Sequence, residues 1–148
     1  MNPAQRLAEL LAGLAAKLGL DALPVGENGI CTLVIDDALP LNIAVDAPGR
    51  DLILFSPLGE LPAAQRGEFM ARMLRANGAG ASIYTFGLAP AGDAALLSAR
   101  YPLANLDAAI LERVAGEFVS VAAHWRTALA APAPAQDGEG PGNGWLLA

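Results

Sequence analysis

The residue types that most often carry chemistry are few in this chain. His124 is the only histidine, and Cys31 is the only cysteine. Spacing alone does not exclude a Ser-His-Asp or Cys-His pair, because such partners meet in space rather than along the sequence. No nucleophile motif surrounds His124, however, and Cys31 lies in an apolar, alternating segment. We therefore expect a structural or surface role for His124 and a small core side chain at Cys31.

Two adjacent carboxylates, Asp36 and Asp37, are the next candidates, as a metal site or an acid–base pair. Neighbouring residues of a strand point to opposite faces of a sheet. Aspartate also favours turns, where its side chain bonds to nearby peptide groups. The pair therefore predicts a turn. No second cluster of His, Cys or carboxylates has the spacing of a zinc site, so we expect neither a metal ion nor a cofactor.

The glycine-rich stretch 77–82, NGAGAS, has the composition of a phosphate-binding loop. It follows a predicted helix rather than a strand, and it lacks the lysine of a Walker motif. We interpret it as a helix-to-strand connection. The sequence therefore favours a protein that is not an enzyme. A small enzyme that uses His124 or the aspartate pair is the alternative, and a polar cleft would support it.

The composition suggests that this chain has a partner. Apolar residues make up 54% of the chain and charged residues 16%, against about 45–50% and about 25% in typical globular proteins. The excess predicts either oligomerisation or apolar surface kept for a partner. The net charge of −6, with no basic stripe, argues against nucleic acid and against an anionic membrane surface. A single cysteine excludes an internal disulfide bond and fits a reducing cytoplasm.

The first half of the chain shows clear periodicity. Leucines recur at three- and four-residue spacing over residues 7–18, and predict a helix from Asn2-Pro3 to Gly19. Because this segment is spaced as a helix, we read it as structure and not as a signal peptide. Period-two alternation predicts a hairpin of strands over 30–35 and 41–45, and then a third strand over 52–56.

The second half is expected to hold a helix over 62–77, strands within 82–90 and 94–103, and a helix that starts at Asn105 or Asp107. The order helix, three strands, helix, two strands, helix predicts an α+β fold with a mainly antiparallel, twisted sheet packed on helices.

The domain is expected to cover residues 1–130. We expect the Pro/Gly-rich tail, 131–148, to be disordered. Its last five residues, GWLLA, are interpreted as a frayed end, with a short anchor on a neighbour or partner as the alternative.

The third strand poses a question about surfaces. Residues 52–62 read LILFSPLGELP, and the strand part is apolar on both faces. Other elements must pack on both faces of such a strand to exclude water. A chain of 148 residues has few helices or strands left to cover the second face.

Several segments of the chain, taken in their order along the sequence, resemble the class I type III secretion chaperones, the CesT/Tir chaperone family. The resemblance covers about residues 7–129 and rests on LAELLAGLAAKLGL, ENGICTLVIDD, LNIAV, LILFSPLGELP, MLRANG and ARYPLANLDAAILERVAGEFVSVAAHW. It implies a cytoplasmic homodimer that binds the N-terminal segment of a secreted effector, keeps it extended and delivers it to the export apparatus. The export ATPase is a further partner that it suggests. A structural or regulatory dimerisation module without a client is the alternative.

The resemblance and the periodicity together suggest two surfaces. Residues proposed to contact the effector are Leu10, Leu14, Val34, Ala44 and Leu54. Residues proposed for the dimer interface are Phe69, Met70, Met73, Leu74, Tyr84 and Phe86.

Overall fold

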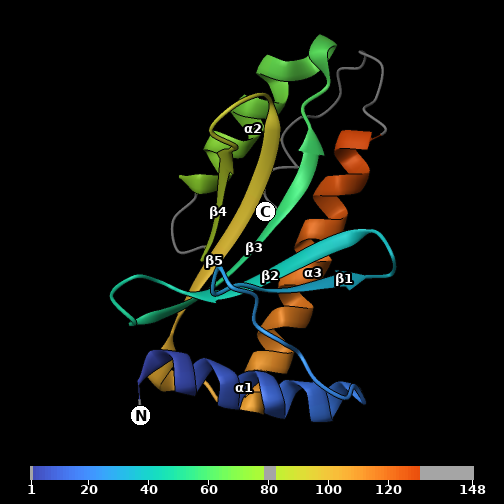
Figure 1. The fold of residues 1–148 in the computed structure, drawn as a ribbon. Coiled ribbons are helices and arrows are strands. Elements are labelled where there is room, and N and C mark those ends of the chain that lie inside the picture. Colours follow the sequence, from blue (N-terminus) through green and yellow to red (C-terminus); the bar gives the residue numbers. More distant parts are fainter. Residues whose placement is uncertain (1, 79–82, 131–148) are drawn as a thin grey trace.

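The computed structural model describes residues 2–78 and 83–130. Their elements, in chain order, are α1 (Pro3–Leu18), β1 (Cys31–Ile35), β2 (Leu39–Val45), β3 (Asp51–Glu60), η1 (Ala63–Gln65), α2 (Arg66–Asn77), β4 (Tyr84–Leu88), β5 (Ala94–Pro102), η2 (Leu103–Asn105) and α3 (Ala108–Ala130). The strands form one sheet in the order β1-β2-β3-β5-β4, and each neighbouring pair is antiparallel. The predicted fold class is therefore confirmed, and Figure 1 shows the strong twist of the sheet. The tail with GWLLA lies outside the described residues.

The ends of α1 are set by local capping. The Asn2 side chain accepts a hydrogen bond from the Gln5 amide at 2.8 Å, and the Gln5 side chain accepts one from the Asn2 amide at 3.0 Å. This reciprocal capping box satisfies two amides that a helix start leaves without partners. At the other end Gly19 takes the left-handed conformation, with φ 72°. Both predicted boundaries of the first helix are confirmed.

The β1–β2 turn is tighter than expected. Asp36 and Asp37 have φ values of 53° and 58°, and the Ala38 amide donates to the Ile35 carbonyl at 3.0 Å. Left-handed backbone at two successive residues matches the twist of a hairpin and allows a turn of only two residues between the strands. Strand β2 therefore already begins at Leu39. The prediction of a turn at the aspartate pair is confirmed.

Of two other boundaries, the end of β3 differs from the expectation and the start of α3 agrees with it. Strand β3 continues past residue 56 to Glu60, because it pairs with β5 through a register shift between Pro57 and Gly59. Of the two possible caps for α3, Asp107 is the one used, since its side chain accepts from the Ile110 amide at 2.8 Å.

The core lies on one face of the sheet, which we call the inner face. Helix α1 packs against α3 and β2, α3 packs against β3, and α2 packs against β4. Alternate residues of the central strands point into this layer and are buried, namely Leu41, Ile43, Leu52, Leu54, Leu97 and Ala99. Cys31 is also buried, as predicted. The described helices thus pack together against this single face of the sheet.

Candidate functional site

The opposite face of the sheet, which we call the outer face, carries the alternate residues of the same strands. Val34 is 60% exposed, and five further apolar residues of this face are half-buried, namely Ala44, Ile53, Phe55, Pro57 and Leu96. The ladder places Ala44 opposite Ile53 and Pro57 opposite Leu96. Side chains directly opposite each other on one face are in contact range. The outer face is therefore an apolar surface that crosses several strands.

Polar side chains on the outer face are tied to the sheet itself. The Thr32 hydroxyl donates to Asn42 Oδ1 at 2.7 Å, and Asn42 Nδ2 donates to the Phe55 carbonyl at 3.2 Å. Hydrogen-bonding capacity used within the sheet is not left over for a partner. A partner on this face would therefore meet mainly apolar surface.

Charged residues border the outer face near the β2–β3 turn. Arg100, opposite Ile53 in the ladder, lies 3.2 Å from the Asp46 carboxylate and 3.5 Å from that of Asp51. Hydrogen bonds from the Asp51 and Arg50 amides, together with Arg100, hold the pKa of Asp46 below its usual range, against a smaller effect of desolvation. The apolar surface is therefore bordered at this end by a fixed, partly neutralised charge cluster.

The structure divides the residues proposed to contact an effector into two groups. Val34 and Ala44 lie on the outer face. Leu10 and Leu14 are each 2% exposed and Leu54 is 0% exposed. The last three lie in the core of the chain itself, so an effector cannot reach them in this arrangement, and we remove them from the proposed surface.

The physical reason differs between the two elements. The leucine stripe of α1 is a single stripe, and its part from Leu7 to Leu14 is buried in the core, where α1 packs on α3 and β2, whereas Leu18 at its end is 46% exposed. In β3, Leu54 lies opposite Ile43, which is 0% exposed. Cross-strand neighbours share a face, and this rule assigns Leu54 to the core. The same rule identifies Ile53 and Phe55, which the sequence reasoning missed, as the outward residues.

The residues proposed for a dimer interface divide in the same way. Phe69, Met73 and Phe86 are 3%, 4% and 5% exposed, and they pack within the chain. Met70 and Tyr84 are half-buried, whereas Leu74 is 67% exposed. Three of the six residues therefore fasten α2 to its own domain.

An aromatic cluster stabilises the packing of α2 on its own domain. The Phe86 and Trp125 rings lie 4.6 Å apart, and the Arg72 guanidinium lies 5.0 Å from the centres of both the Phe69 and Trp125 rings. A cation over an aromatic face is attracted by the ring quadrupole. With its inner side held in this way, α2 exposes Leu74 on its other side, and Met70, one turn earlier, is half-buried at the edge of the core. Ile83, just before β4, is a further exposed apolar residue at 46%.

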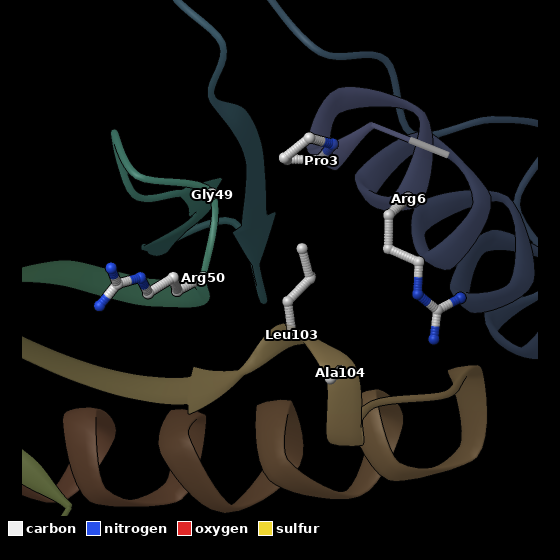
Figure 2. A pocket seen from close by; sticks show the side chains of 6 residues that line it. All are labelled: Pro3, Arg6, Gly49, Arg50, Leu103 and Ala104. Atoms are coloured by element: carbon white, nitrogen blue, oxygen red, sulfur yellow. The ribbon is translucent and has the colours of Figure 1, made fainter.

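A shallow hollow lies between the start of α1, the β2–β3 turn and η2 (Figure 2). Its lining consists of Pro3, Arg6, Gly49, Arg50, Leu103 and Ala104. The two arginine side chains point away from each other, and Arg6 is held by Glu9 and by the Leu106 carbonyl. The lining holds no carboxylate, imidazole or thiol, so it offers no acid–base or nucleophilic chemistry.

The residues considered for catalysis are not brought together. His124 is exposed on α3, Asp36 and Asp37 are exposed in the hairpin turn, and Cys31 is buried on β1. Burial raises the pKa of the Cys31 thiol, which makes it less reactive. Within residues 2–78 and 83–130, no three His, Cys, Asp or Glu residues are grouped as metal ligands would be. Among the described helices, none has both the length and the hydropathy to cross a membrane.

Solved structures share this fold. The ExsC–ExsE complex matches with a TM-score of 0.68 at 21% identity, over 87% of this chain and 97% of the other. The HopA1–SchA chaperone–effector complex matches with a TM-score of 0.71 at 19% identity, over 84% and 95%. The ExoT–SpcS complex from Pseudomonas aeruginosa matches with a TM-score of 0.60 at 24% identity, over 84% and 98%. No curated protein matches by sequence.

The fold is thus that of a small α+β protein with helices on one face of an antiparallel sheet. A model of the Tir chaperone protein (CesT) family matches residues 9–126. The chain belongs to this family. It is a family of chaperones and not of enzymes, which confirms both the resemblance noted in the sequence and the expectation of a non-enzymatic protein.

Proposed function

We propose that this chain is a cytoplasmic, dimeric chaperone that binds the N-terminal segment of a type III secretion effector, keeps it extended and delivers it to the export apparatus. Membership of the CesT family supports the chaperone role. The observation that carries the binding proposal is the outer face, where apolar residues of β1, β2, β3 and β5 lack a cover among the described elements.

The outer face suits an extended, unfolded segment. Several solved relatives are complexes, one of them described as a chaperone with its effector. A disordered partner loses conformational entropy when it binds, so it must contact a large apolar area to compensate. The outer face extends over four strands and offers such an area. We assign Val34, Ala44, Ile53 and Phe55 to effector contact.

The homodimer is proposed to form through α2. Leu74 is exposed on the side of α2 that faces away from its own core, and Met70, one turn earlier, is half-buried at the border between that side and the core. A two-fold contact of this face with its copy would cover Leu74 of both protomers at once. The dimer would also double the apolar surface available to one effector. The export ATPase remains a proposed partner at the delivery step.

The effector proposal is tested by co-purification from the chain's own host under secretion-inducing conditions. We expect a larger protein to accompany the chain. A fusion of that protein's N-terminal segment to a reporter should bind the chain in isolation, and export of the reporter should require the chain. A reporter that is exported equally well without the chain would refute the proposal.

The outer face is tested by Val34→Asp, with Ala123→Asp as the matched control. Both positions are exposed, so neither substitution should unfold the chain. Removing the Val34 contact and burying a carboxylate against the effector should weaken binding about ten-fold or more, whereas Ala123 lies outside the outer face on α3. Equal binding by the two variants, measured by calorimetry, would remove Val34 from the site.

A further inference from the structure

The sheet ends in two edge strands, β1 and β4. An edge strand carries peptide groups without a neighbour, and these can pair with a strand of another molecule. On β4 the two peptide groups of Phe86 are both taken by one side chain. Asn77 Nδ2 donates to the Phe86 carbonyl at 2.9 Å, and Asn77 Oδ1 accepts from the Phe86 amide at 2.7 Å. Asn77 is the last residue of α2.

The direction of these peptide groups follows from the ladder. In an antiparallel pair, residues bonded to the opposite strand alternate with residues whose peptide groups point away from it. The Ala89 amide donates to the Ala94 carbonyl at 2.9 Å, so residues 89, 87 and 85 form the set bonded to β5. Phe86, opposite Leu97, belongs to the other set. Its amide and carbonyl therefore point away from β5, toward the free edge of the sheet, and there they bond to Asn77.

We propose that Asn77 closes the β4 edge against the addition of a strand from a second copy of this chain. Phe86 is the central residue of Tyr84–Leu88, so a strand added along β4 would have to displace the Asn77 amide from both bonds. This inference goes beyond the proposed function, because it concerns copies of the chain and requires no effector.

The closure has a consequence for assembly. If β4 of one copy paired with β1 of the next, the contact would join two different surfaces. Such a contact does not close on itself, and it leads to open chains of molecules. Asn77 thus prevents a strand of another copy from pairing with β4. It does so without covering the outer face or the exposed side of α2.

The experiment compares Asn77→Ala with Asn28→Ala in the full chain. Asn28 also bonds a main-chain amide with its side chain, that of Ile30 at 3.0 Å, but it lies in the loop before β1. We expect Asn77→Ala to speed hydrogen exchange at the Phe86 amide by about ten-fold or more. We also expect its mass in sedimentation equilibrium to rise with concentration beyond that of the unaltered chain. Asn28→Ala should do neither.

Two further variants make the test decisive. Adding Leu88→Pro to Asn77→Ala removes an outward amide that an added strand would need, and it should return the mass to that of the unaltered chain. Asn77→Gln keeps the amide group but shifts it by one methylene group, and it gives the same test if the alanine variant does not fold. Faster exchange at Phe86 with no growth in mass would overturn the proposal, since Asn77 would then only fasten α2 to β4.

Discussion

Met73 and Leu74 are consecutive residues of α2 with opposite environments, and the contrast tests the proposed dimer. Met73 is 4% exposed and Leu74 is 67% exposed. Leu74→Asp should leave the fold intact, because substitutions at exposed sites change stability by less than about 0.5 kcal/mol. Met73→Asp should unfold the chain, because removing a buried methionine side chain costs about 2–5 kcal/mol and a buried, unpaired carboxylate adds to that cost.

The expected effect of Leu74→Asp on the dimer follows from its exposure. Full burial of a leucine side chain contributes about 1.5–3 kcal/mol, and 67% of Leu74 is available for burial. Each protomer would then lose about 1–2 kcal/mol, and the symmetric dimer about 2–4 kcal/mol. This range corresponds to a dissociation constant raised about 30- to 700-fold.

The assay is sedimentation equilibrium over a concentration series, with urea unfolding followed by circular dichroism on the same samples. Leu74→Asp should be folded but monomeric at concentrations where the unaltered chain is a dimer. Either of two results would refute the reasoning: a Leu74→Asp dimer as tight as the unaltered one, or a Met73→Asp chain with an unchanged unfolding midpoint. The first removes α2 from the interface, and the second contradicts the burial of Met73.

Three further predictions concern the scaffold. Gly49→Ala should lower the free energy of unfolding by about 1–3 kcal/mol in urea titrations, because Gly49 has φ 77° and a Cβ there would lie 2.5 Å from Pro3 Cγ. Arg72→Ala should cost about 1–2 kcal/mol through loss of its two ring contacts and shift Trp125 fluorescence, with Arg72→Lys retaining part of the stability; an unchanged midpoint would contradict this. Burial raises the pKa of Tyr101 above its ordinary value, so its stabilising effect is complete below pH about 10 and is lost as pH rises further; Tyr101→Phe should reduce this alkaline loss of stability, and an identical pH profile would refute it.

The sequence predicted the elements well because their signals are local. The capping box at Asn2, the turn at Asp36 and the alternation of the strands each depend on residues within a few positions of one another. Boundaries such as the end of β3 depended on pairing with β5, which lies about 40 residues further along the chain, and these were predicted less accurately.

The site was harder to predict because exposure is not a local property. Periodicity showed that Leu10 and Leu14 share a stripe, but it did not show that the chain's own α3 and β2 cover this part of the stripe. It also placed Met73 and Leu74 together in one interface, although a step of about 100° around the helix separates neighbouring residues. Alternation within β3 did not show which of its two sides faces the core, and only the pairing of Leu54 with the buried Ile43 assigns Leu54 to the core.

Strand β3 is apolar on both faces because the two faces of the sheet pack differently. Leu52 and Leu54 help to build the core, which the chain completes with its own helices. Ile53 and Phe55 point the other way and stay half-buried, so water is only partly excluded from them until a partner arrives. A chaperone for an unfolded segment needs such a surface ready before its partner is present, because any local cover would have to be displaced first and would subtract from the binding free energy. The apolar surplus in the sequence therefore fits effector capture, and Ile53→Lys together with Phe55→Lys should abolish capture. Because both side chains are half-buried, the urea midpoint should fall as well, and capture should be lost even at temperatures and urea concentrations where circular dichroism shows the variant to be folded.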